Sequence, residues 1–232
     1  MSNEQWKREA ARAAVEREVR SGMTLGLGTG STVAHALDAL GEALREWRLE
    51  NVRGVPTSEQ TAARARELGI PLLELHEAGE LDVTIDGADE IDTNLDLIKG
   101  LGGALLREKM VAQATRRLVI IADGGKRVER LGQKAPVPVE VVPFGWRAHL
   151  PFLESLGARP VLREEAGEPY RTDNGNYVID CHFEPEEGIL DPQVLDWQLL
   201  GRAGIVEHGL FLDMAAIAYV AGPGGLVVLD RD

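Results

Sequence analysis

The sequence predicts an α/β protein with a Rossmann-like, mainly parallel sheet, helices on both faces, and a smaller inserted ferredoxin-like α+β domain. Two observations predict it. Apolar strand-like runs alternate with helix-like segments over the first 125 residues, which is typical of crossover connections in a parallel sheet. Near residue 127 this alternation gives way to prolines and a hairpin signal, which indicates a second kind of domain.

The first elements are predicted from composition and from the residues that end them. Residues 4–20 are rich in Ala, Glu and Arg, and their apolar positions recur on one helical face. Gly22 ends this helix, and residues 23–30 are typical of a buried strand that runs into a glycine turn. A helix over 31–47 follows, with Val33 and three leucines on one stripe.

The rest of the first domain repeats the pattern. The expected elements are a strand at 52–55, a helix that opens at Thr57 and Ser58 and closes near Gly69, a strand over 81–90 that ends in an acidic loop, a glycine-opened helix over 99–117, and an apolar strand at 118–123. Each helix is long enough to connect two parallel strands.

The second domain is predicted over residues 128–205. Its expected elements are a Val-rich strand within 133–145, a helix at 146–156, a turn at 173–176 before a strand at 177–181, a helix at 190–201, and a strand-like segment at 204–211. This β-α-β-β-α-β order resembles a ferredoxin-like unit. Residues 1–127 and 206–232 should form the Rossmann-like domain, with the last strand, 225–232, returning to its sheet.

Composition excludes several classes of partner and site. The chain has 232 residues, with 25 Lys and Arg against 38 Asp and Glu, a net charge of −13. That charge argues against nucleic acid or an anionic membrane as a partner. The single cysteine, Cys181, excludes an internal disulfide and a thiolate zinc site. Without an apolar leader or a membrane-length apolar run, we expect a cytoplasmic protein.

Polar loops follow the predicted strands, where ligands bind in an open parallel sheet. The first is Gly28–Thr32, which opens a helix whose N–H groups favour an anion. It fits neither the dinucleotide nor the P-loop template, which leaves a cradle for a single phosphate. The alternative is a tight turn with a Ser or Thr cap.

The acidic loop after the third strand holds a second candidate group. Asp86 and Asp89 are suited to bind hydroxyls, to shift each other's pKa, or to hold a metal. The alternative for such residues is helix capping within a solvated acidic loop, and we favour it for Glu90 and Asp92. The calcium-loop spacing is absent, and a magnesium site stays open.

Lysines and one glutamate complete the candidates. Lys126 directly follows a strand, Lys99 precedes a glycine run, and Lys7 lies on the first helix with Arg8 as its neighbouring alternative, so each is placed to bring positive charge to an anion. The alternative for each is a solvated surface lysine. Glu108 shares a helical face with two apolar residues and is a candidate general base, against the alternative of a surface glutamate. The five scattered histidines have no ligand spacing, and Cys181 is most simply a core residue.

Five motifs together resemble one family. GLGTGST at 26–32, PTS at 56–58, DGADEID at 86–92, KGLGGALLREK at 99–109 and IADGGK at 121–126 are similar to ribose-5-phosphate isomerase of type A, in order and spacing. The resemblance implies interconversion of ribose 5-phosphate and ribulose 5-phosphate, in the non-oxidative pentose phosphate pathway, with no metal and no cofactor. It also implies a homo-oligomer, a dimer or tetramer.

The resemblance also assigns roles to residues. It places the proton acceptor on Glu108, and we propose Asp86, Asp89 and Lys99 as the other catalytic residues. The implied substrate-binding residues are Thr29, Gly30, Ser31, Thr32, Gly87, Ala88, Gly100, Leu101, Gly102, Lys126 and Lys7. One departure is Gly125, where the family usually has Ser or Thr; a hydroxyl contact is lost there, although the glycine still offers its backbone N–H.

Three other functions remain open at this stage. A related sugar-phosphate isomerase or deaminase would use a similar phosphate loop. A sugar-phosphate-sensing regulatory domain would bind without turnover, but only about 22 residues precede the first strand to hold a DNA-binding segment. A two-carboxylate magnesium phosphatase would release phosphate from ribose 5-phosphate.

Overall fold

The computed structural model describes residues 2–231, which divide into two compact units. Of the described residues, unit 1 holds those up to Ala88, Arg107–Lys126 and those from Met214 onward. Unit 2 holds Asp89–Leu106 and Arg127–Asp213. Residues 89–106, which lie in the first domain of the division predicted from sequence, thus cluster with unit 2.

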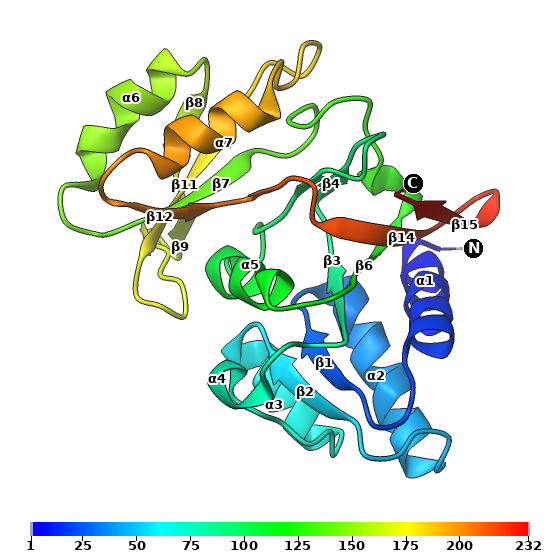
Figure 1. Cartoon of the computed structure of the whole chain (residues 1–232). Helices are drawn as coiled ribbons and strands as arrows, with labels where there is room; N and C mark the ends of the chain where they lie inside the picture. The colour runs from blue at the N-terminus through cyan, green and yellow to red at the C-terminus, as the bar shows by residue number, and fades with distance from the viewer. Residues whose placement is uncertain (1, 232) are drawn as a thin grey trace. The chain divides into compact units, whose positions relative to one another are not determined.

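Unit 1 is built on a six-stranded sheet in the order β15-β14-β6-β3-β1-β2 (Figure 1). Its strands are β1 (Thr24–Leu27), β2 (Arg53–Pro56), β3 (Val83–Gly87), β6 (Leu118–Asp123), β14 (Ala215–Gly222) and β15 (Gly225–Asp230). All neighbours pair in parallel except β14 and β15, which form a terminal antiparallel hairpin. The predicted mainly parallel sheet is confirmed, and so is the return of the last strand to it.

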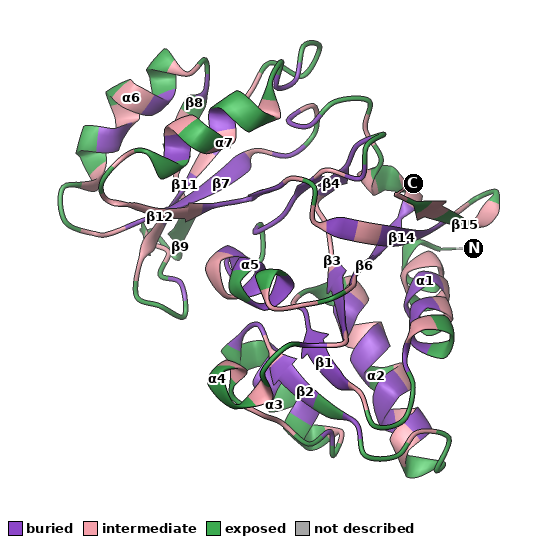
Figure 2. Ribbon diagram, in the orientation of Figure 1, coloured by how far each residue is buried: buried purple, intermediate pink, exposed green. Residues whose placement is uncertain are grey.

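Helices cover both faces of this sheet. They are α1 (Asn3–Glu18), α2 (Ser31–Arg45), α3 (Glu59–Glu67), α4 (Leu75–Ala78) and α5 (Leu105–Gln113), of which α5 begins in unit 2 and continues into unit 1. Alanines and leucines of α1 and α2 pack with β1, β3, β6 and β14 in one apolar cluster. A second cluster joins Val111 of α5 and residues of α4 to β2. Figure 2 shows β1 and β3 buried, while the edge strand β15 is partly exposed.

Unit 2 contains a four-stranded antiparallel sheet in the order β12-β7-β11-β8. Its elements are β7 (Val137–Val141), η2 (Trp146–His149), α6 (Leu150–Ser155), β8 (Arg159–Leu162), β11 (Tyr177–His182), α7 (Pro192–Leu200) and β12 (Ile205–His208). Both the element order and the strand order are those of a ferredoxin-like unit, as predicted. The core lies between α6, α7 and one face of the sheet, where Val137, Val139 and Val141 of β7 and Ile179 and Cys181 of β11 belong to one apolar cluster.

Several elements were not expected from the sequence. A second small sheet, in the order β13-β5-β4, is formed by β4 (Glu90–Ile91), β5 (Leu97–Ile98) and β13 (Leu210–Phe211). A short hairpin joins β9 (Glu164–Glu165) and β10 (Glu168–Pro169). The predicted strand at 204–211 is two strands in two different sheets, and β14 lies in a stretch to which no element was assigned.

Candidate functional site

The loops predicted to bind ligand in unit 1 lie at one edge of its sheet. Because β1, β3 and β6 are adjacent and parallel, residues 28–32, 86–88 and 124–126 leave the same edge side by side. Adjacent strands are about 4.8 Å apart, so the first and third loops start about 10 Å from each other. A small phosphorylated molecule spans that distance.

The loop after β1 is fitted closely around Asp86. The Asp86 carboxylate is buried, and its Oδ1 accepts from the backbone N–H of Thr29 at 3.1 Å and of Gly87 at 2.7 Å. A Cβ placed on Gly28 would lie 2.1 Å from that oxygen and 2.7 Å from the Asp86 Cα. Only glycine therefore lets the two loops approach this closely.

The side chain of Thr29 lies in a cluster of hydroxyl groups. Its Oγ1 is hydrogen-bonded to Thr57 at 2.8 Å, to Ser58 at 2.9 Å and to Thr61 at 3.2 Å. Thr61 in turn donates to the carbonyl of Gly28 at 2.8 Å. The cluster ties the loop after β1 to the loop after β2, so the Thr29 hydroxyl has a structural task within the protein. Sequence reasoning missed Thr61.

Positive charge collects where α2 begins. Ser31 and Thr32 form the first turn of this helix, which carries the partial positive charge of its dipole. The Lys7 ammonium lies 3.1 Å from the Ser31 Oγ and 2.8 Å from Glu4. Gly30 and Ser31 also line a groove of about 480 Å³ between α2 and α3. The structure thus brings together Lys7 and Ser31, 24 residues apart, as an anion site requires.

The loop after β6 is a 3₁₀ turn, η1 (Gly124–Lys126), with Lys126 half-buried. The Gly125 N–H donates to the Asp123 carboxylate at 2.9 Å. The backbone N–H that Gly125 still offers is therefore engaged with a carboxylate of its own loop. Lys126 remains as the charged group that the loop offers.

Glu108 is buried on α5, with only 4% of its surface exposed. Leu105 and Ala112 on the same face are buried too, as predicted, and the surface-glutamate alternative is wrong. The Ala114 carbonyl, just past the end of α5, accepts from Leu81 just before β3 at 2.8 Å. As a crossover helix, α5 runs antiparallel to the strands, so Glu108 lies about 9 Å further toward their carboxyl ends. Figure 1 draws α5 beside β3.

Unit 2 carries the other predicted residues. The Asp89 carboxylate accepts from the N–H of Leu101 at 2.9 Å, which joins the acidic loop to the 99–102 segment. Lys99 is buried, with its backbone N–H bonded to Gly209 and its ammonium 5.4 Å from the centre of the Phe211 ring. Asp89, Lys99 and Leu101 therefore belong to one locally fixed group.

Glu90 and Asp92 are not parts of a solvated acidic loop, as was expected. Glu90 is fully buried, and its carboxylate accepts from the backbone N–H groups of Gly132, Lys134 and Ala135 at 2.5–2.7 Å. Asp92 is also buried and accepts from two backbone N–H groups of its own turn. Both carboxylates hold backbone segments in place. Glu90 is also the first residue of β4, a strand of the small sheet of unit 2.

The remaining candidates are structural. Within residues 2–231, no three side chains of His, Cys, Asp or Glu are grouped to hold a metal ion. Burial raises the pKa of the Cys181 thiol to about 12, which fits an inert core residue. No helix in this described part is long and apolar enough to cross a membrane.

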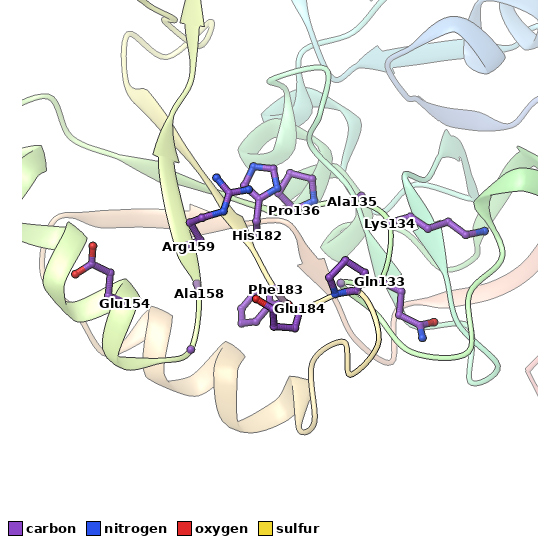
Figure 3. Close-up of a pocket in the computed structure, with 13 residues that line it drawn as sticks. Gln133, Lys134, Ala135, Pro136, Glu154, Ala158, Arg159, His182, Phe183 and Glu184 are labelled. Carbon is purple, nitrogen blue, oxygen red and sulfur yellow. The ribbon is translucent and has the colours of Figure 1, made fainter.

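A separate cavity of about 420 Å³ lies in unit 2 (Figure 3). Arg159 and His182 lie side by side at one end, while Glu154 and Glu184 also line it. None of the residues predicted to bind substrate contributes to it. The mixed charges of its lining favour no single class of charged ligand.

Comparison with known proteins finds relatives over nearly the whole chain. The family described as ribose 5-phosphate isomerase A (phosphoriboisomerase A) matches residues 53–225. Ribose-5-phosphate isomerase A of Roseiflexus castenholzii is 52% identical over 99% of this chain and 97% of its own. A D-ribose-5-phosphate isomerase solved in complex with phospho-erythronic acid is 39% identical, with a TM-score of 0.96 over the whole of both chains. The ribose 5-phosphate isomerase of Plasmodium falciparum is 39% identical in sequence, with a TM-score of 0.95 over 99% of each chain.

Proposed function

The chain belongs to the ribose 5-phosphate isomerase A family and interconverts ribose 5-phosphate and ribulose 5-phosphate; on that premise we propose how its own residues divide the work. The buried carboxylate of Glu108, in the first turn of α5 and so at the end of that helix nearest the carboxyl ends of the strands, is the observation that carries the assignment. A carboxylate in that position is suited to move a proton between two neighbouring carbons.

The substrate phosphate binds at the edge of the parallel sheet in unit 1. Ser31 and Thr32 offer hydroxyl and amide donors at the positive end of α2, and Lys7 and Lys126 supply charge. In a chain with a net charge of −13, these cations offset the repulsion that a dianion meets. Binding at this distant end positions the reacting carbons.

The reaction transfers a proton between carbon-1 and carbon-2. Glu108 takes the proton from carbon-2 of the open-chain aldose, which leaves an enediolate, and returns it to carbon-1. The hydroxyl proton of the carbon-2 oxygen passes to the carbon-1 oxygen, which gives the ketose. Asp86 and Asp89 bind the sugar hydroxyls and assist ring opening. Lys99 stabilises the negative charge that develops on the oxygens. The backbone of Gly30, Gly87, Ala88 and Gly100–Gly102 lines the sugar.

Replacing Glu108 by Gln tests this assignment. We expect kcat to fall at least about 100-fold, because positioned acid–base groups contribute 10²–10⁴. The measurement is a coupled assay on ribose 5-phosphate with excess chelator, in which the parent enzyme should keep full activity. Glu59→Gln is the control and should behave as the parent. Glu59 is an exposed glutamate of α3 that pairs with Arg107, the neighbour of Glu108 on α5. Near-parental turnover by Glu108→Gln removes Glu108 from the role.

We propose that the enzyme is a homodimer. Support comes from α7 and the residues before it, where Leu190, Val194, Trp197 and Leu200 are exposed apolar side chains. A patch of this kind is typical of a protein interface. Analytical ultracentrifugation should give twice the chain mass, and Trp197→Glu should shift it toward the monomer; a monomeric parent contradicts the proposal. The cytoplasmic location and the role in the pentose phosphate pathway stay predictions that follow from substrate and product.

A further inference from the structure

Arg163 holds the loop that carries Lys99. Its Nη1 donates to the carbonyl of Gly100 and to that of Leu101, each at 3.1 Å. The same guanidinium makes a two-pronged contact with Asp180, with Nη2 at 2.5 Å from one carboxylate oxygen and Nε at 2.9 Å from the other. Both side chains are largely buried, at 13% and 16% exposure. One planar group thus links a sheet to a glycine-rich loop.

The inserted sheet fixes the direction of this contact. Ile179 and Cys181 of β11 are buried in the core under α6 and α7, so Asp180 between them points to the opposite face of the sheet. Arg163 directly follows β8, and its backbone N–H is bonded to Val178 of β11. The carboxylate and the guanidinium are therefore held by adjacent strands of a rigid sheet.

Tyr170 extends the same arrangement. Its ring lies 5.6 Å from the Arg163 guanidinium carbon. A Cβ on Gly103 would lie 2.1 Å from the Tyr170 hydroxyl oxygen, and Gly103 has a φ of +79°. Glycine is needed there both for its backbone conformation and for the close approach. The 99–103 loop thus contacts Arg163 at Gly100 and Leu101, and it packs against Tyr170 at Gly103.

The carbonyl contacts determine where the loop's N–H groups point. In a trans peptide, the carbonyl of one residue and the N–H of the next point in opposite directions. With the Gly100 carbonyl on Arg163, the Leu101 N–H must point away from it, and it donates to Asp89 at 2.9 Å. Because the Leu101 carbonyl also accepts from Arg163, the Gly102 N–H points away from Arg163 as well, in the direction of the Leu101 N–H.

We propose that Arg163, oriented by Asp180, is a positioning residue for the isomerisation: it turns two consecutive peptide groups so that their N–H groups serve Asp89 and the oxygens of the sugar. This rests on the proposed role of the 99–102 loop in substrate binding. Lysine cannot substitute, because a single ammonium lacks the planar fork that binds a carboxylate and two carbonyls together.

Arg163→Lys and Asp180→Asn test the proposal. Loss of one oriented donor to a developing negative charge costs 10²–10³ in other enzymes. We expect kcat to fall at least about tenfold in Arg163→Lys, and less in Asp180→Asn. The inhibition constant of inorganic phosphate should stay within twofold of the parent, because the phosphate residues lie in unit 1. The double variant should be no worse than Arg163→Lys, since the two residues act as one pair.

Arg171→Lys is the matched control. Arg171 lies just after the β9–β10 hairpin, donates to a backbone carbonyl and stacks on Tyr177, but those contacts do not reach the 99–103 loop. It should keep parental kinetics. Near-parental kcat in folded Arg163→Lys, or an equal weakening of phosphate inhibition, overturns the proposal.

Hydrogen exchange of the ligand-free enzyme measures how well the backbone amides of the 99–103 loop are protected, independently of turnover. Peptides that cover residues 99–103 should exchange faster in Arg163→Lys and Asp180→Asn than in the parent and in Arg171→Lys. Unchanged exchange in both variants also overturns the proposal. This readout does not depend on Glu108, so failure of the proposed catalytic assignment would show separately, as an active Glu108→Gln enzyme.

Discussion

The two units position their functional residues by different means. In unit 1, the residues follow the ends of parallel strands, and the sheet order brings the loops after β1, β3 and β6 together, with the Asp86 carboxylate bound to the Thr29 N–H. In unit 2, the acidic loop and the 99–102 loop are held by side chains that bind backbone. Glu90 accepts from three amides, Asp89 from Leu101, and Arg163 donates to two carbonyls.

This difference predicts which kind of substitution should damage each unit most. A strand-end loop depends on close backbone approach, so added volume should damage it more than a lost side-chain bond. A loop held by buried charge depends on single side chains, so an isosteric change of charge should damage it. The three changes that follow test each side of the comparison.

Gly28→Ala should have the largest effect. The new Cβ would lie 2.1 Å from the Asp86 carboxylate oxygen and 2.7 Å from its Cα, so backbone has to move. A displacement near 1 Å of a reacting group costs about 100-fold in rate, and overpacking costs about 1–3 kcal/mol of stability. Steady-state kinetics and urea unfolding measure the two. Gly224→Ala, which meets no atom within 4 Å, is the control; equal behaviour of the two variants contradicts the close-packing argument.

Glu90→Gln should destabilise the protein without touching substrate. An amide NH₂ would replace one carboxylate oxygen and face the N–H of Gly132, which leaves a buried donor without its acceptor. We expect a loss of about 2–4 kcal/mol in the free energy of unfolding. Urea unfolding measures it, with the exposed Glu164→Gln as control. A loss equal to that of the control would mean that the buried carboxylate is not what holds this segment.

Lys126→Ala should have the smallest effect. Removing one charge-assisted contact to the phosphate should raise KM about tenfold and change kcat less, because the interaction is made equally in ground and transition states. Kinetics on ribose 5-phosphate measure both constants. Lys134→Ala, outside the candidate site, should leave them unchanged. A parental KM in the Lys126 variant would show that the other cations suffice.

Much of unit 1 could be predicted from the sequence, because its signals are local. The apolar strands, their glycine turns and the face of Glu108 each lie within a few consecutive residues. The ferredoxin-like order of unit 2 was also readable from its turn at 173–176 and its alternating strands. What failed was any assignment to residues 215–222, which form the long, buried strand β14.

The rest depends on partners far apart in the chain. Glu90 is buried because amides 42–45 residues later surround its carboxylate, and nothing beside it in the sequence announces them. Arg163 reaches the carbonyls of Gly100 and Leu101 across 63 and 62 residues of the chain. One signal was available: a lone acid between Ile179 and Cys181 in an otherwise apolar strand predicts a charged partner on that face.

The cluster of Thr29, Thr57, Ser58 and Thr61 has a thermodynamic consequence. Four hydroxyl groups that already satisfy one another hold the turn after β1 rigid before any ligand arrives. Binding then incurs little loss of conformational entropy at this turn, and more of the interaction with an anion remains as net affinity. In the proposed phosphate site, the cluster therefore contributes through the stiffness of this turn.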